Sequence, residues 1–194
     1  MEYVSVRNAP EKRRKDCTDG KEKHLTEAAV MIAFAMHLLK EGATEVAIHP
    51  DGEHGKKYPI RECLESRGFV FSSTRGTTSY GGEYRRGNEV MIVWPKSGLG
   101  DVTARINNKV LCAECKGGVI NSRHAGQTSR LRKGLCEALG QLMIRPLVGE
   151  RHVAVVPKAK ITEGLAGKIL TRATAAGIEI ALVDENGGVG FLHS

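Results

Sequence analysis

The chain has 194 residues, of which 41% are hydrophobic and 26% charged, the composition of a globular protein large enough to bury one core. Its sequence contains no apolar run long enough to span a bilayer, which argues against an integral membrane protein. The five cysteines have no framework spacing, and the start of the chain has no apolar signal core, so we predict a cytoplasmic protein with reduced thiols.

The formal net charge is +7, with a calculated pI of about 9.3. Such a surplus favours polyanionic partners, although many basic proteins bind no nucleic acid. Aromatic residues make up only 5% of the chain, which argues against a platform that stacks the bases of single strands.

Three regions are expected along the chain. Residues 1–24 mix both charges and include the basic run KRRK at 12–15, so we predict a loosely packed basic N-terminal segment. Residues 25–194 are predicted to form a single domain. Within it, residues 43–88 are interpreted as an elaboration for substrate recognition.

The first strongly predicted element is a helix over 25–42, which Thr26 can cap and Gly42 can end. The helix is apolar on nearly every side from residue 28 to 39, so we expect it to be buried. Glu27 lies at its mouth. It is either a first-turn carboxylate favoured by the helix dipole or part of a site.

Shorter elements follow. The sequence predicts strands over 44–50, 69–73 and 88–95 and a helix over 59–68. The stretch 72–88 is rich in Gly, Ser and Thr, which is typical of a surface loop or a mobile hairpin.

The C-terminal part alternates helices and strands. Helices are predicted over 128–144 and 161–177, the second capped by Thr162, with a strand over 151–157 between them. Residues 178–192 form one strand, or two around a turn. Strand–helix–strand implies a parallel pair, whereas the hairpin described next is antiparallel. We therefore predict an α/β fold, bordering on α+β, with helices on the faces of a mixed sheet.

Residues 98–118 are predicted to form a β-hairpin around Asn107-Asn108, because Asn tolerates the positive φ of a two-residue turn. That turn fixes the register, in which Asp101 lies opposite Glu114. One face then collects a row of small apolar side chains and is predicted to be core: Val102, Ala104, Ile106, Leu111, Ala113 and Cys115. The other face collects the polar set: Asp101, Thr103, Arg105, Val110, Cys112, Glu114 and Lys116.

The two acids are expected at a non-hydrogen-bonded pair, where Cα atoms approach to about 4.5 Å. Lys116 then lies diagonally, within about 7–8 Å of Asp101. Opposed like charges destabilise a sheet unless a proton, a lysine or a cation relieves them. Two readings stay open here. The acids hold a hard divalent cation, or the hairpin frays and leaves both solvated.

Asp101 followed by Glu114-x-Lys116 resembles the signature of the PD-(D/E)xK nuclease superfamily, which has the restriction-endonuclease-like fold. Gly100 departs from the family's name, which has proline at that position. The family core is a helix, a three-stranded meander, a second helix and a further strand, αβββαβ in order. The predicted elements that match it are 25–42, 89–116, 128–144 and 151–157.

The resemblance implies a role for each matching residue. Asp101 and Glu114 would hold one or two Mg²⁺ ions, for which Mn²⁺ can substitute. The carbonyl of Cys115 would be a further metal ligand, and Glu27 matches an acid that some members add from the first helix. Lys116 would position or activate the attacking water.

The helix after the motif adds candidates for substrate binding. Gln141 resembles a glutamine that some branches of the family place there, and it is expected to act with the catalytic set. Several cations fall on or near the same sector of the helix, which is read either as a phosphate-facing surface or as an ordinary solvated face. The candidates for nucleic-acid binding are Arg123, Arg130, Arg132 and Lys133.

Three further patterns in the sequence are weaker. Cys112 and Cys115 point to opposite faces of the predicted strand, so they cannot chelate one zinc ion. The loop HPDGEH at 49–54 resembles a metal loop but is better explained as a polar turn. The segment GEYRRGN at 82–88 presents a basic tip that either touches nucleic acid or is a plain exposed hairpin.

Together these features predict a Mg²⁺-dependent nuclease acting on DNA, with an endonuclease as the first expectation. The alternative is a catalytically silent nucleic-acid-binding subunit with the same fold. A homodimer or a larger complex is compatible with either. A glycosidase with paired carboxylates is a third reading, but the lone tryptophan and the basic surplus argue against a sugar cleft.

Overall fold

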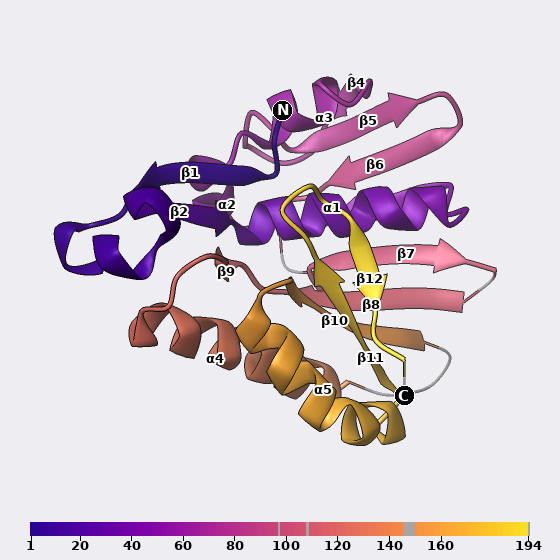
Figure 1. Ribbon diagram of the computed structural model, residues 1–194. Coiled ribbons are helices and arrows are strands. Elements are labelled where there is room, and N and C mark those ends of the chain that lie inside the picture. Colours follow the sequence, from indigo (N-terminus) through magenta and orange to yellow (C-terminus); the bar gives the residue numbers. More distant parts are fainter. Residues whose placement is uncertain (97, 108, 146–149, 194) are drawn as a thin grey trace.

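The computed structural model describes residues 1–96, 98–107, 109–145 and 150–193. Its centre is a nine-stranded mixed sheet with helices on both faces, which confirms the predicted α/β class (Figure 1). The strands follow one another across this sheet in the order β12 (Val189–Phe191), β11 (Ile178–Val183), β10 (Glu150–Pro157), β8 (Lys109–Cys115), β7 (Val102–Ile106), β3 (Glu45–Ile48), β6 (Glu89–Val93), β5 (Gly82–Arg86) and β4 (Val70–Thr74).

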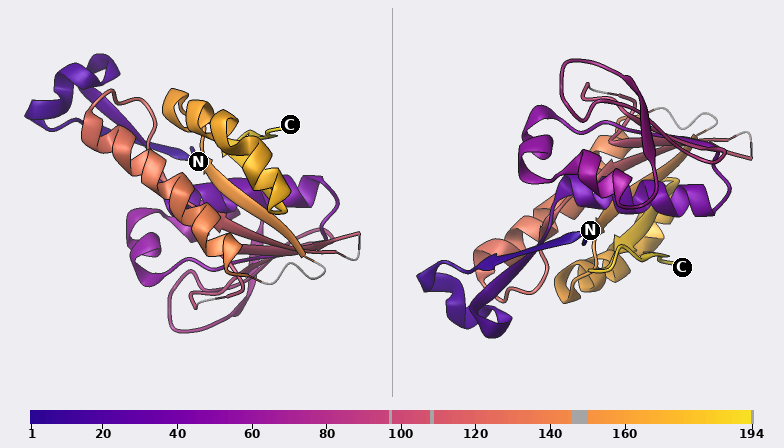
Figure 2. Two further views of the ribbon diagram at one scale, coloured as in Figure 1. Left: turned by 90° about the horizontal axis from the view of Figure 1, so that it is seen from below. Right: turned by 90° about the horizontal axis from the view of Figure 1, so that it is seen from above.

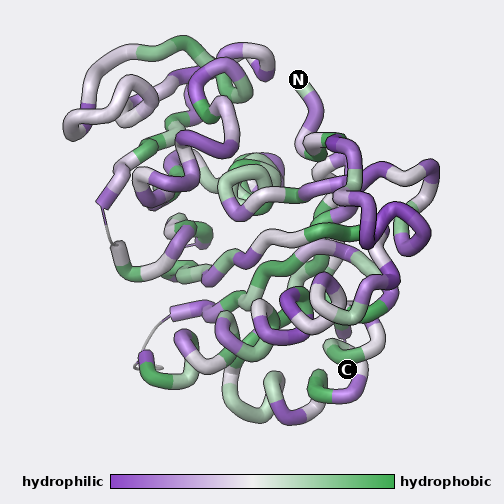
Figure 3. The backbone as a smooth tube through the Cα atoms, turned by 90° about the vertical axis from the view of Figure 1, so that its left-hand side faces the viewer, coloured by the Kyte–Doolittle hydropathy of each residue, from purple (hydrophilic) through white to green (hydrophobic). Residues whose placement is uncertain are grey.

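Helix α1 (Glu27–Lys40) covers one face of the sheet, and α4 (Ala125–Met143) and α5 (Lys160–Ala175) cover the other (Figure 2). As predicted, α1 is buried on nearly all sides, and Figure 3 shows it end-on in the middle of the fold with mostly apolar turns. Thr26 caps it by accepting a hydrogen bond from the Ala29 N–H at 3.2 Å. Each face of the sheet therefore has its own apolar core.

Helices α4, α5 and the short α3 (Ile60–Glu65) lie close to their predicted positions. A further short helix, α2 (Gly52–Lys57), forms where the sequence analysis expected a polar turn. The sequence predicted Thr162 as the N-cap of α5. This is wrong, because α5 begins two residues earlier, at Lys160. Its hydroxyl instead accepts from the Ala159 N–H at 3.0 Å and donates to the Pro157 carbonyl at 2.6 Å. Thr162 thus ties the helix start to the end of β10.

The predicted register of the β7–β8 hairpin is confirmed. Val102 pairs with Ala113 and Ile106 with Lys109, and Asn107 has the positive φ of 49° that such a turn needs. Asn108 lies outside the described residues. The predicted core face packs against α1, but the opposite face is not open. Cys112 belongs to the second core, beneath α4 and α5, because these helices cover that face.

The predicted three-stranded meander is wrong in its first member. β6 does not neighbour β7, because β3 lies between them, antiparallel to β7 and parallel to β6. The element order helix, meander, helix, strand is instead made by α1, β3, β7, β8, α4 and β10, with β8 and β10 parallel. The segment that connects β3 to β7 in the chain adds β6, β5 and β4 to the edge of the sheet.

Residues 1–24 are not a loose tail. β1 (Val4–Asn8) pairs antiparallel with β2 (Lys21–Leu25), and β2 pairs with β9 (Gly118–Val119), which forms a second, three-stranded sheet. Two 3-10 turns, η1 (Glu11–Asp16) and η2 (Thr18–Gly20), connect β1 to β2 and carry the basic run. The charges that resembled a solvated tail thus lie mainly on a hairpin and its connection.

The predicted loop 72–88 contains β5, and its basic tip is already engaged. Arg85 pairs with Glu83, and Arg86 pairs with Glu89 at 2.6 Å. Tyr84 is fully buried. This tip therefore does not present free cations to a partner. In the part of the chain that the structure describes, no helix is long and apolar enough to cross a membrane.

Candidate active site

The acids and the lysine singled out by the sequence meet where β8 ends beside the start of α1. The Lys116 Nζ lies 3.8 Å from Glu27 Oε1 and 4.0 Å from Asp101 Oδ2. A cavity of about 440 Å³ opens in front of this group, and its wall includes Glu27, Asp101 and Glu114. Residues from three distant parts of the chain therefore share one polar pocket.

Asp101 reaches this pocket in a different way from the one predicted. The paired ladder ends at Val102 and Ala113, so Asp101 and Glu114 are not a cross-strand pair. The Asp101 N–H donates to the Ala113 carbonyl at 2.9 Å, and its Oδ2 accepts from the Cys115 N–H at 2.7 Å. The carboxylate thus takes the place of a strand partner for β8, while both acids still line the same cavity.

Burial and crowding disturb the protonation of this group. Burial raises the pKa of Asp101 to about 7, and the nearby charges of Glu114 and Glu27 add to that rise. The Cys115 N–H and Lys116 partly offset it. Burial also raises the pKa of Glu27, against the opposing charge of Lys116. When both are ionised, Asp101 and Glu27 therefore carry more negative charge than Lys116 balances.

Two glycines allow the backbones to approach here. A Cβ at Gly117 would come within 2.4 Å of the Glu27 nitrogen and 2.6 Å of the Leu25 carbonyl oxygen, so only glycine lets β8 end against the start of α1. A Cβ at Gly100 would come within 2.7 Å of the Cys112 Sγ. This contact explains why position 100 holds glycine rather than proline.

Glu114 is engaged by a residue that the sequence analysis missed. The Arg145 guanidinium donates to Glu114 Oε1 at 2.7 Å, and Glu114 is only 5% exposed. Arg145 follows the end of α4 and also lines the cavity. No local signal in the sequence marks it, because its contact with Glu114 depends on how α4 packs across the sheet.

His54 is a second addition, from the HPDGEH segment that the sequence analysis set aside. Its Nε2 lies 3.5 Å from Glu27 Oε1, and its Nδ1 accepts from the Asp51 N–H at 3.1 Å. Burial lowers the pKa of His54. The neutral ring therefore carries its proton on Nε2, facing Glu27. The pairing of β3 with β7 brings this segment to the site, since the His49 N–H donates to the Asp101 carbonyl at 2.8 Å.

A divalent cation would find suitable donor chemistry but no closed set of ligands. The three carboxylates offer hard oxygen atoms, and their mutual repulsion favours a cation between them. Yet within the described ranges no group of three or more His, Cys, Asp or Glu side chains is close enough to hold a metal ion. The Cys115 side chain is buried in the core, so only its carbonyl remains a predicted ligand.

The remaining predicted residues lie on α4 or just before it, outside the cavity wall. Gln141 is exposed on α4, and no side-chain hydrogen bond joins it to a residue that the structure describes. The predicted phosphate-binding residues are likewise exposed, and they form no ion pair with the described part of the chain: Arg123, Arg130, Arg132 and Lys133. The same helix contacts the site at Gly134, where a Cβ would come within 3.1 Å of the Lys116 Cβ.

Comparison with known proteins assigns no relative. The chain has no significant match to any protein-family model, to any curated protein or to any solved structure. The chemistry of the site is therefore inferred from Asp101, Glu114, Lys116 and their neighbours alone.

Proposed function

We propose that this protein is a Mg²⁺-dependent nuclease that hydrolyses phosphodiester bonds of DNA, most simply as an endonuclease of the PD-(D/E)xK type. The observation that carries the proposal is the position of Lys116, 3.8 Å from Glu27 and 4.0 Å from Asp101, beside a cavity that Glu114 also lines. A lysine beside two partly buried carboxylates that line a cavity matches the demands of this reaction, because the phosphate and the attacking water both need charge stabilisation.

The carboxylates support the cation part of the proposal. The pKa of Asp101 is raised to about 7 and that of Glu27 is also raised, which means that their ionised forms are destabilised together. A cation bound by Asp101, Glu114 and Glu27 would relieve this repulsion. When bound, Mg²⁺ neutralises charge on the phosphate and lowers the pKa of a bound water.

The residues of the chain itself would then have separate tasks. Lys116 donates hydrogen bonds to the attacking water or to a phosphate oxygen, and the two carboxylates beside it orient its ammonium group. Asp101 holds the end of β8 in place through the Cys115 N–H, so this strand end is fixed relative to the acids. The neutral His54, with its Nε2 proton facing Glu27, orients that carboxylate.

The proposal is tested by nuclease assays on the wild type and on Lys116→Met. The substrates are supercoiled, linear, branched and single-stranded DNA, and RNA, each with Mg²⁺, with Mn²⁺ or with EDTA. We expect cleavage of at least one DNA form that needs the metal and falls at least about a hundredfold in Lys116→Met. Lys56→Ala, a change at an exposed lysine paired with Glu53, is the control and should cleave normally. Cleavage that survives both EDTA and Lys116→Met would overturn the assignment.

One observation favours the alternative of a silent nucleic-acid-binding subunit. The Arg145 guanidinium already neutralises Glu114, as it would permanently do in a site that had lost its cation. This alternative predicts DNA binding of equal strength in the wild type and in Lys116→Met, with no cleavage in either metal. The two functions are therefore separated by the same set of assays.

A further inference from the structure

A second cavity, of about 360 Å³, lies on the other side of Glu27 and His54. Both residues also line the cavity of the candidate active site, so the two hollows adjoin along this shared wall. Part of the lining of the second cavity is basic and comes from the N-terminal hairpin and α2. Its polar and charged side chains there are Ser5, Arg7, His24 and Lys57.

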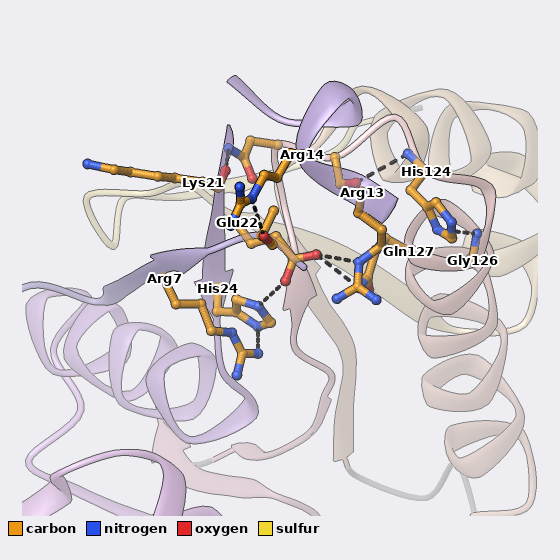
Figure 4. A network of polar contacts seen from close by, with 12 residues as sticks. Arg7, Arg13, Arg14, Lys21, Glu22, His24, His124, Gly126 and Gln127 are labelled. Carbon is orange, nitrogen blue, oxygen red and sulfur yellow. Dashed lines mark hydrogen bonds and ion pairs between the residues drawn. The ribbon is translucent and has the colours of Figure 1, made fainter. Parts of the chain in front are cut away.

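A chain of hydrogen bonds that starts at a buried carboxylate orients Arg7 (Figure 4). Glu22 is 1% exposed, and its Oε2 pairs with His24 Nε2 at 3.2 Å. The His24 Nδ1 in turn pairs with the Arg7 guanidinium at 2.6 Å. Burial lowers the pKa of His24, so the ring is neutral, donates from Nε2 to Glu22 and accepts at Nδ1 from Arg7. A neutral imidazole thus holds Arg7 in place, and no carboxylate of the described residues forms an ion pair with it.

The scaffold under Arg7 is firmly built. The other Glu22 oxygen accepts from Arg13 at 2.7 Å and from the buried Gln127 of α4 at 3.4 Å (Figure 4). The hairpin is also joined to the segment before α4, where Asn121 accepts from the Lys23 N–H at 2.8 Å. Arg13 is therefore charge-balanced and structural, whereas Arg7, on the same hairpin, is available to a ligand.

Lys57 supplies a second free cation from α2. It forms no ion pair with any residue in the described ranges, whereas its neighbour Lys56 pairs with Glu53 at 2.6 Å and lies outside the cavity. The lining of the cavity therefore includes two cations, Arg7 and Lys57, that form no ion pair with the residues the structure describes. Its carboxylate, Glu27, is already shared by Lys116 and His54. The balance of charge suits an anion.

We propose that this second cavity, the basic groove, binds the phosphates of a nucleic-acid strand next to the bond that is cut. Arg7 and Lys57 would be the phosphate contacts. The inference rests on the proposed function, because the groove adjoins the active site along the wall formed by Glu27 and His54. Contacts of this kind are made to the backbone rather than to base edges, so they strengthen binding to every sequence alike. The groove thereby sets the path of the strand rather than the choice of sequence.

The test is binding in EDTA, so that the nucleic acid stays intact. Fluorescence anisotropy of a labelled short DNA duplex and of its single strand is measured over a range of salt concentrations. We expect Arg7→Ala and Lys57→Ala each to weaken binding by about five- to tenfold. Each should also reduce the slope of log K against log salt by about 0.9 for duplex or about 0.7 for single strands. Lys56→Ala, one residue from Lys57, should change neither quantity.

Thermal melting checks whether each variant is folded, and Lys57→Ala carries the test should Arg7→Ala lose its structure. Binding in Arg7→Ala and Lys57→Ala that equals binding in Lys56→Ala would overturn the groove, as would a wild type that binds no nucleic acid. The proposed function fails separately. Weaker binding in both variants, without metal-dependent cleavage by the wild type, would keep the groove and remove the nuclease.

Discussion

Arg145 places a guanidinium 2.7 Å from the carboxylate of Glu114, the acid that the proposed cation would need. The Arg145 Nε is buried and has no hydrogen-bond partner among the described residues. The guanidinium thus has a strong hydrogen bond at its terminal nitrogen and an unsatisfied N–H at Nε. Such a side chain is suited to leave when a better ligand for Glu114 arrives.

Arg145→Ala should therefore increase the affinity of the site for Mn²⁺, because the cation no longer competes with the guanidinium. Loss of one charge-assisted hydrogen bond of about 1.5 kcal/mol corresponds to roughly tenfold tighter binding. Isothermal titration calorimetry of the two proteins measures this directly. The matched control is Arg151→Ala. Arg151 lies outside the site and pairs with Glu179 at 2.8 Å, so its removal should leave Mn²⁺ affinity unchanged. Unchanged affinity in Arg145→Ala would show that the pair does not block the cation.

Asp101→Asn should separate stability from activity. Because the pKa of Asp101 is raised in the folded protein to about 7, the folded state binds a proton more tightly than the unfolded state. Its contribution to stability is therefore present below pH 3.8, the ordinary pKa, and is lost as pH rises toward about 7. The asparagine keeps an oxygen for the Cys115 N–H but carries no charge.

We therefore expect metal-free Asp101→Asn to be more stable than the wild type at pH 8, by up to about 4 kcal/mol in the free energy of unfolding, and nearly equally stable near pH 4. Urea denaturation at both pH values measures the difference. The same variant should lose metal-dependent cleavage. A variant that is less stable than the wild type at pH 8 would contradict the raised pKa.

The sequence predicted the parts of the site that local geometry determines. The turn at Asn107 fixes which residues of β7 and β8 pair, so the approach of Asp101 to the end of β8 follows from a short stretch of chain. The buried helix α1 was equally clear, because its apolar residues leave no polar face. These features depend on neighbours in sequence.

Long-range packing determined what the sequence analysis missed. β3 fits between β7 and β6 through pairing with residues more than forty positions away, and no turn specifies that choice. This insertion is what brings His54 to Glu27. The charges of residues 1–24 do not mark a solvated tail, because they pair with one another: the buried Glu22 binds Arg13 from the connection between β1 and β2, and His24 two residues further along its own strand.

Gly117→Ala tests the close approach that joins Glu27 to Lys116. The added Cβ must push the end of β8 away from the α1 backbone, so we expect a loss of about 1–3 kcal/mol in the free energy of unfolding. Any cleavage activity should fall as well, since Lys116 moves with the strand. The control is Gly140→Ala in α4, where a Cβ would have no neighbour within 4 Å and alanine should stabilise the helix by about 0.5–1 kcal/mol. The stability of both variants is measured by thermal or urea denaturation. Equal stability of Gly117→Ala and Gly140→Ala would contradict the packing argument.

Glu22→Gln tests the buried support of the N-terminal hairpin. The hydrogen bond from Arg13 holds the pKa of Glu22 below its ordinary 4.5, helped by His24 against the effect of burial. A depressed pKa gives stability that is present above pH 4.5 and is lost as pH falls through the folded-state value. At neutral pH we therefore expect Glu22→Gln to lose about 2 kcal/mol in the free energy of unfolding. The deficit should shrink in acid, as the wild-type carboxylate is protonated.

Glu185→Gln, which removes an exposed partner of Lys23, is the control and should be nearly neutral. Because His24 connects Glu22 to Arg7, Glu22→Gln should also weaken DNA binding in EDTA. A variant as stable as the wild type at pH 7 would show that the buried carboxylate does not hold the hairpin.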